Sequence, residues 1–233
     1  GARLAELSGR LPAGRSAALS FAAAPSEIEA QVRSDLATPG LLSQLEQRQY
    51  TALLAGFAFA HKRYDEALSL HQKVRAQLPD QAWAEAAIAS YNIGNVHLAR
   101  GELADAERAF GQATSVCLDQ NLASLLPIIL CNLSLSLQGQ QERTAEALRC
   151  LELARSLSVQ QGLRPLEAHV LDSLGRLHTA AGNPAEARRH LDEARALIEG
   201  WRSEFVTDIR SAALAGLGPL PPDLPRAALP SQP

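Results

Sequence analysis

The stretch that decides the fold runs from Tyr91-Asn92-Ile93-Gly94-Asn95 through Gly101-Glu102-Leu103 to Ala106, Phe110 and Ala113. Its spacing returns 81 residues later. Residues of the same type stand at both places in five pairs: Gly94/Gly175, His97/His178, Gly101/Gly182, Ala106/Ala187 and Ala113/Ala194. Chance is a poor explanation for five matches at one offset, so the chain contains an internal repeat.

Two further units follow the same spacing, and together the four units describe helical hairpins. Each second helix is expected to carry a small residue, and these are Ala67, Ala106, Ala147 and Ala187. Successive members of this set are 39, 41 and 40 residues apart. The small residues expected on the first helices are Ala55, Gly94, Ser134 and Gly175. Small residues at matched heights let two antiparallel helices approach closely. We expect Gly101 and Gly182 to make the turns, because glycine tolerates the left-handed conformation that ends a helix. Bulky residues that would fill the gap to the next hairpin are Phe110, Leu151 and Leu191.

This pattern resembles the tetratricopeptide repeat (TPR) over roughly residues 41–200. The resemblance is strong in the second and fourth units and weaker in the third, where the Gln138–Thr144 turn is one residue longer. The unit of about 40 residues exceeds the usual 34 of the family. It is similar to the repeats of bacterial peptide-sensing regulators. The resemblance implies an all-α fold, a right-handed α-α superhelix of antiparallel helical hairpins.

The chain divides into four parts on this reading. Residues 1–40 form an N-terminal helical extension, with short helices at 3–9 and 15–24 and a helix from 26 to 37 that opens on the capping-box spacing of Ser26 and Glu29. The repeats span about 41–80, 81–120, 121–162 and 163–200, with helices expected at 41–61, 64–78, 81–100, 103–119, 123–139, 142–160, 165–181 and 184–199. Residues 201–217 form a capping helix, and 218–233, with six of the 13 prolines, form an extended or disordered tail. Pro127 either sits in the first turn of its helix or delays that helix.

Several classes of function are disfavoured by composition and by missing motifs. A net charge of −3 lacks the basic footprint of a nucleic-acid-binding domain. The three cysteines have neither zinc-ligand spacing nor a disulfide pattern, and no apolar stretch reaches the roughly 18 residues of a membrane span. We therefore expect a cytoplasmic protein. The chain has no methionine and begins at Gly1, which indicates a processing site or a piece of a longer protein.

Neither a catalytic motif nor a phosphate-binding loop is found, so we expect no enzyme and no cofactor. His97 and His178 stand where the family usually has an aromatic residue. A metal role is disfavoured for both, because no second ligand lies three or four residues further along the helix.

The candidate binding surface lies on the first helices, which the resemblance places along a concave groove. The candidate partner-binding residues are Tyr91, Asn92, Asn95, Asn132, Asp172 and Arg176. Asn92 and Asn132 lie 40 residues apart, one repeat, and a carboxamide can both donate to and accept from an extended peptide backbone. The resemblance implies that such asparagines hold ligand backbone. Arg176 could hold a carboxylate.

These residues predict a non-enzymatic scaffold or adaptor that binds a partner peptide or helix. The alternative is a ligand- or peptide-sensing segment of a larger bacterial signalling or transcription-regulating protein. Trp201, Phe205 and Ile209 form a stripe at helical spacing. We expect this stripe to cap the array, with pairing of two copies through an end helix as the other possibility.

Overall fold

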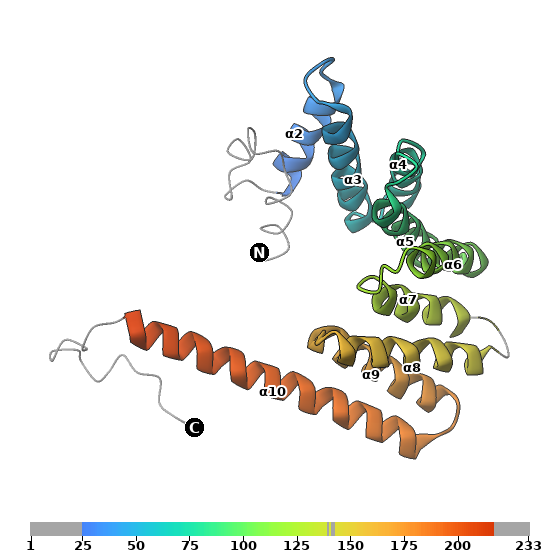
Figure 1. The fold of residues 1–233 in the computed structure, drawn as a ribbon, viewed down its shortest axis with the longest axis vertical. Coiled ribbons are helices and arrows are strands. Elements are labelled where there is room, and N and C mark those ends of the chain that lie inside the picture. Colours follow the sequence, from blue (N-terminus) through green and yellow to red (C-terminus); the bar gives the residue numbers. More distant parts are fainter. Residues whose placement is uncertain (1–24, 139, 141–142, 217–233) are drawn as a thin grey trace. The chain divides into compact units, whose positions relative to one another are not determined.

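The computed structural model describes residues 25–138, 140 and 143–216, and for 203–216 only the helical backbone (Figure 1). The short helices expected at 3–9 and 15–24 and the tail at 218–233 lie outside these residues. The chain separates into two compact units that meet between Gln161 and Gly162. Each unit is described by itself below.

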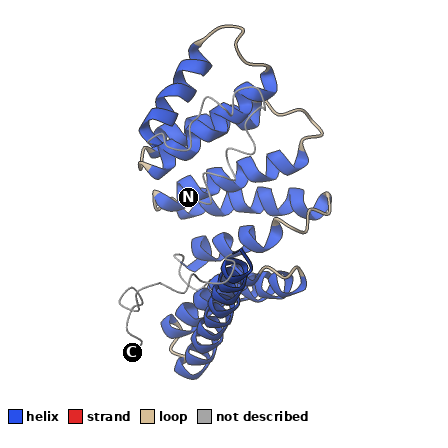
Figure 2. Ribbon diagram, turned by 90° about the vertical axis from the view of Figure 1, so that its left-hand side faces the viewer, coloured by secondary structure: helices blue, strands red, loops and turns tan. Residues whose placement is uncertain are grey.

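All regular structure in the described residues is α-helical, which confirms the predicted fold class (Figure 2). The first unit contains α2 (Pro25–Ala37), α3 (Gln44–Ala60), α4 (Tyr64–Ala76), α5 (Trp83–Ala99), α6 (Leu103–Asp119), α7 (Leu126–Gln138) and α8 (Thr144–Gln160). The second contains α9 (Arg164–Ala180) and α10 (Pro184–Gly216). Consecutive helices pair as hairpins: α3 with α4, α5 with α6, α7 with α8, and α9 with α10.

The small residues of the repeat lie where the two helices of each hairpin touch. Those on the first helices, Ala55, Gly94, Ser134 and Gly175, are all buried, and so are Ala67, Ala106, Ala147 and Ala187 on the second helices. Gly101 and Gly182 have φ of +76° and +75°, as the predicted turns require. One detail differs from expectation. Phe110 and Leu191 pack over the glycine of their own hairpin, Gly94 and Gly175 respectively, rather than only filling a gap to the next hairpin.

Arginines near the hairpin turns tie consecutive hairpins of the first unit together. Arg63, the residue before α4, donates to Glu29 of α2 at 2.6 Å. Arg143, the residue before α8, donates to Glu107 of α6 at 2.6 Å, and Arg100, the residue after α5, pairs with Asp65 of α4 at 2.9 Å. These pairs join each hairpin of the first unit to the helix or hairpin before it.

Several helix boundaries differ from the sequence prediction. The expected capping box at Ser26 is wrong, because α2 already begins at Pro25 and the Glu29 carboxylate is held by Arg33 and Arg63. A capping box forms instead at Ser43, whose hydroxyl accepts from the Glu46 amide at 3.3 Å while its own amide donates to the Glu46 carboxylate at 2.7 Å.

The prediction of two separate helices, at 184–199 and within 201–217, is wrong as well, because α10 runs unbroken through Gly200. An isolated glycine costs a helix only about 1 kcal/mol and does not end it without a following turn. Pro127 is the second residue of α7, so it occupies the first turn of a helix that starts later than predicted. The division into an array and a capping segment at residue 201 stays a prediction.

Candidate functional site

Three of the predicted binding residues meet between the first helices of two consecutive hairpins. The Asn132 side-chain amide on α7 donates to the Tyr91 hydroxyl at 3.1 Å and to the Asn95 carbonyl oxygen at 2.7 Å, both on α5. We call Tyr91, Asn95 and Asn132 the amide cluster. Because both N–H groups of Asn132 are used inside the cluster, its carbonyl oxygen and the amide group of Asn95 remain as an acceptor and a donor on neighbouring helices.

The core holds the amide cluster in place. The Tyr91 ring lies 5.9 Å, centroid to centroid, from the ring of Phe110, which is fully buried. This contact aims the hydroxyl at Asn132. Asn92 is half-buried beside the cluster but takes no part in the hydrogen bonds that join the three side chains. Sequence reasoning grouped Asn92 with Asn132 by repeat spacing. The structure instead joins Asn132 to Asn95, one helical turn further along α5.

Apolar side chains flank the amide cluster on the same helices. Ile88 lies on α5, one turn before Tyr91 and Asn92, and it is 41% exposed. On α7, Ile128 and Leu135 lie one turn on either side of Asn132 and are 38% and 37% exposed. Residues at these spacings share one face of a helix. The surface formed by these three residues and the amide cluster, which we call the α5–α7 face, therefore joins hydrogen-bonding groups to exposed aliphatic groups.

Asp172 and Arg176 belong to the second unit and bond to one another on α9. The Arg176 guanidinium donates to the Asp172 carboxylate at 2.7 Å, and its side chain is 76% exposed. An exposed i, i+4 pair of this kind contributes little to stability and exchanges readily for another carboxylate. In the structure Arg176 is paired within its own helix, and its role in holding a carboxylate of a ligand stays a prediction.

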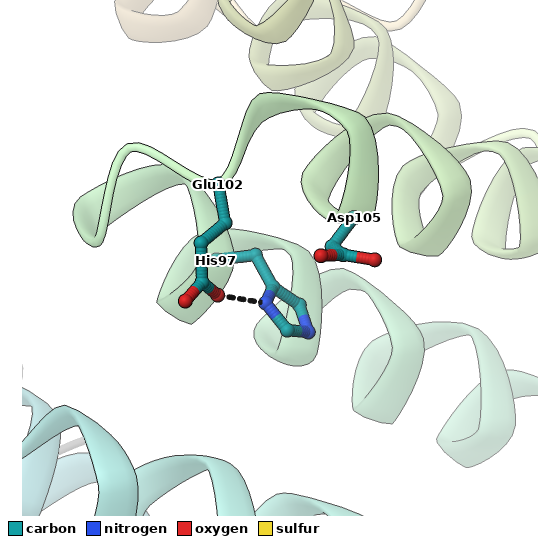
Figure 3. A group of neighbouring side chains, drawn as sticks. All are labelled: His97, Glu102 and Asp105. Atoms are coloured by element: carbon teal, nitrogen blue, oxygen red, sulfur yellow. Dashed lines mark hydrogen bonds and ion pairs between the residues drawn. The ribbon is translucent and has the colours of Figure 1, made fainter.

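A cluster that the sequence analysis did not group lies at the α5–α6 turn (Figure 3). His97, Glu102 and Asp105 bring ligand atoms within 4.8 Å of one another, and His97 Nδ1 is 2.6 Å from the Glu102 carboxylate. Glu102 is five residues beyond His97 and Asp105 eight, both across the turn, so a search at helical spacing misses them. The carboxylates pair with Arg100 and Arg108, each at 2.9 Å, which gives this cluster an explanation as an ion-pair network that fastens the turn.

Two cysteines of the first unit lie in surroundings that disfavour a reactive thiolate. Burial raises the pKa of the Cys117 thiol, and burial is also the main reason that the pKa of Cys150 is raised. A thiol with a raised pKa is a poor nucleophile at neutral pH. Both residues therefore behave as small apolar side chains.

Comparison with known proteins agrees with this architecture. Residues 125–199 match the family model of the tetratricopeptide repeat. This match covers about a third of the chain, and the fold of the described residues is that of TPR-like repeat proteins. No curated protein matches the chain by sequence. Among the described residues, we find no helix that combines the length and the apolar character of a membrane span.

Solved structures of low sequence identity share the fold. A putative kinesin light chain of Podospora anserina with TPR-like repeats is 17% identical, with 76% of this chain and 88% of that chain covered and a TM-score of 0.62. A Rap protein complexed with Competence and Sporulation Factor is 16% identical, with 75% and 48% covered and a TM-score of 0.64. Aspartyl phosphate phosphatase F of Bacillus subtilis is 14% identical, with 84% and 49% covered and a TM-score of 0.65. The chain spans about half the length of the last two proteins.

Proposed function

We propose that this chain is a non-enzymatic interaction module, whose α5–α7 face binds an extended peptide segment of a partner protein. The observation that carries the proposal is the pair of hydrogen bonds from Asn132 to Tyr91 and Asn95. They fix an amide acceptor and an amide donor on adjacent helices before any ligand arrives, which lowers the entropic cost of binding.

The chemistry of this face suits a peptide backbone flanked by apolar side chains. An extended peptide presents alternating N–H and C=O groups, and each can bond to a carboxamide regardless of the peptide sequence. Ile88, Ile128 and Leu135 then offer aliphatic contacts to the side chains of the ligand. Arg176 belongs to the second unit and is proposed separately as a contact for a carboxylate, available when Asp172 releases it. The proposal includes a cytoplasmic location and no nucleic-acid partner.

Affinity capture from a lysate of the source organism, read by quantitative mass spectrometry, tests this proposal. The bait would be the chain itself, compared with an Asn95→Ala/Asn132→Ala variant whose helicity and melting temperature are measured first. The matched control is Gln112→Ala, which removes an exposed amide from the second helix α6. We expect a partner that the chain and the control capture equally and that the double variant loses.

The partner would then be divided into overlapping synthetic peptides, and each peptide titrated against the same three proteins. A peptide that binds the chain and the control, and binds the double variant at least tenfold more weakly, would support the α5–α7 face. Equal binding of the peptides to the chain, the control and the double variant would place the interface elsewhere and refute the proposal.

A second candidate function is a sensing segment of a larger signalling or transcription-regulating protein. The structural likeness to the Rap protein, which was crystallised with Competence and Sporulation Factor, favours it. Determining the full reading frame discriminates between the candidates. An output domain joined to these repeats favours sensing, whereas a reading frame that holds only these repeats favours an adaptor.

A further inference from the structure

A groove of about 590 Å³ opens on the second unit along one face of α10. The residues that line it on α10 are Pro184, Ala187, Arg188, Leu191, Asp192 and Arg195, and those at the end of α9 and in the turn are Thr179 and Gly182. Leu191 is half-buried, while Arg188 and Arg195 are exposed. Leu191 already contacts Gly175 of α9, and beyond that contact no helix within residues 162–202 covers Arg188 and Arg195. Arg195 pairs with Asp192 at 3.3 Å, whereas Arg188 has no ion pair among the described residues.

Comparison with the equivalent helix of another repeat indicates which kind of element packs against this face of α10. At the 81-residue offset, Arg188 is equivalent to Glu107 and Leu191 to Phe110 on α6. That face of α6 is covered by the next first helix, α7, and Phe110 is fully buried. Glu107 accepts there from Gln140 at 2.8 Å and from Arg143 at 2.6 Å, both in the turn that follows α7. The equivalent face of α10 therefore has the shape that receives a helix.

The charge at this position is reversed. Where α6 presents the Glu107 carboxylate to a guanidinium, α10 presents the Arg188 guanidinium, so a complementary helix must bring a carboxylate. The chain's own residues at the position of Arg143 are Arg63, Glu102 and Asn183. Of these only Glu102 is acidic, and it is already bonded to His97 and Arg100. A second copy stacked in the register of the array therefore offers no free carboxylate at this position.

We propose that the α10 face made by Arg188, Leu191 and Arg195 docks an amphipathic helix of a different protein, with a carboxylate of that helix paired to Arg188. The aliphatic stripe of the helix packs beside Leu191, in the place that α7 takes against α6. This surface is separate from the α5–α7 face, so the proposal does not depend on peptide binding there.

Two synthetic 17-residue helices, matching α5 and α9 in length, would serve as probes. Both carry the same leucine stripe on an alanine background, flanked by glutamate in one and by lysine in the other. Heteronuclear NMR of the full chain locates binding, and fluorescence anisotropy measures affinity. We expect the glutamate helix to bind more tightly and to shift resonances of Arg188, Leu191 and Arg195.

Charge reversal on the protein supplies the decisive comparison. Arg188→Glu should lower the affinity for the glutamate helix at least about fivefold, because it removes an attraction and adds a repulsion. The same change should raise the affinity for the lysine helix. Arg202→Glu makes the same change on the same helix about 21 Å away and should leave both affinities nearly unchanged.

Equal binding of the two helices, or resonance shifts confined to other surfaces, would overturn the proposal. So would a dimer in sedimentation experiments that Arg188→Glu dissociates, because that result would assign the face to a second copy.

Discussion

A Cβ atom built on Gly94 would lie 2.6 Å from Cε1 of Phe110, so the aromatic ring of α6 rests directly on the backbone of α5. Real Cβ atoms are essentially never this close to a neighbour, and the position accepts only glycine unless the ring moves. The same relationship holds between Gly175 and Cγ of Leu191, also at 2.6 Å. The repeat thus couples a glycine on the first helix to a bulky residue on the second.

Gly94→Ala should therefore destabilise the fold. Overpacking of a core costs about 1–3 kcal/mol, which exceeds the helix-propensity gain of about 1 kcal/mol from replacing glycine by alanine. Gly111→Ala on α6 is the matched control, because a Cβ there meets nothing within 4 Å and only the propensity gain remains. Urea unfolding should give a lower free energy of unfolding for the first variant and a higher one for the second. A stabilised Gly94→Ala would refute the close helix contact.

His71 should make the protein less stable in mild acid. It is buried at the position that Phe110, Leu151 and Leu191 occupy in the other hairpins, and burial lowers its pKa to about 4. The unfolded chain takes up a proton at His71 near pH 6.5, whereas the folded chain resists until about pH 4. The His71 contribution to the free energy of unfolding therefore falls by about 3 kcal/mol as the pH is lowered through this window.

His71→Leu, which installs the residue found at this position in two of the other hairpins, should remove this part of the pH dependence. Chemical denaturation between pH 4 and 7 measures it. An unchanged slope of stability against pH in the variant would show that His71 is not the titrating group.

Glu29→Gln should weaken the attachment of α2 to the first hairpin. The Arg63 guanidinium, aided by Arg33, holds the pKa of the Glu29 carboxyl below its usual range, and the side chain is only 12% exposed. We expect a loss of about 1–2 kcal/mol in the free energy of unfolding at pH 7. A depressed carboxyl pKa stabilises the fold above the unfolded value near 4.3, and this contribution is lost as the pH falls through the folded pKa.

The deficit of Glu29→Gln should accordingly shrink below pH 4. Glu85→Gln, on an exposed residue of α5, is the control and should change stability by less than about 0.5 kcal/mol. A variant as stable as the control at pH 7 would remove Glu29 from the contacts that hold α2.

The histidine at the α5–α6 turn illustrates what spacing rules miss. His97 has no ligand-type residue at helical spacing, yet the turn at Gly101 brings Glu102 to 2.6 Å from its ring. Periodicity describes neighbours along one helix, whereas a turn reverses the chain and creates neighbours that no period predicts. The same limit applies to Asn132, whose partners Tyr91 and Asn95 are 41 and 37 residues away.

The sequence by itself determined the repeat, the helical class and the residues at the hairpin contacts. The size of a side chain and the freedom of the backbone act locally at these contacts. Residues such as Gly94, Gly101 and Ala106 therefore predict the same local structure in each repeat in which their type recurs. Only the tertiary structure decided which side-chain amides bond to one another and which carboxylates pair with arginines such as Arg143. It also decided that α10 continues through Gly200. Those outcomes depend on the stagger between hairpins and on the balance of contacts over many residues, neither of which is written in the spacing of one helix.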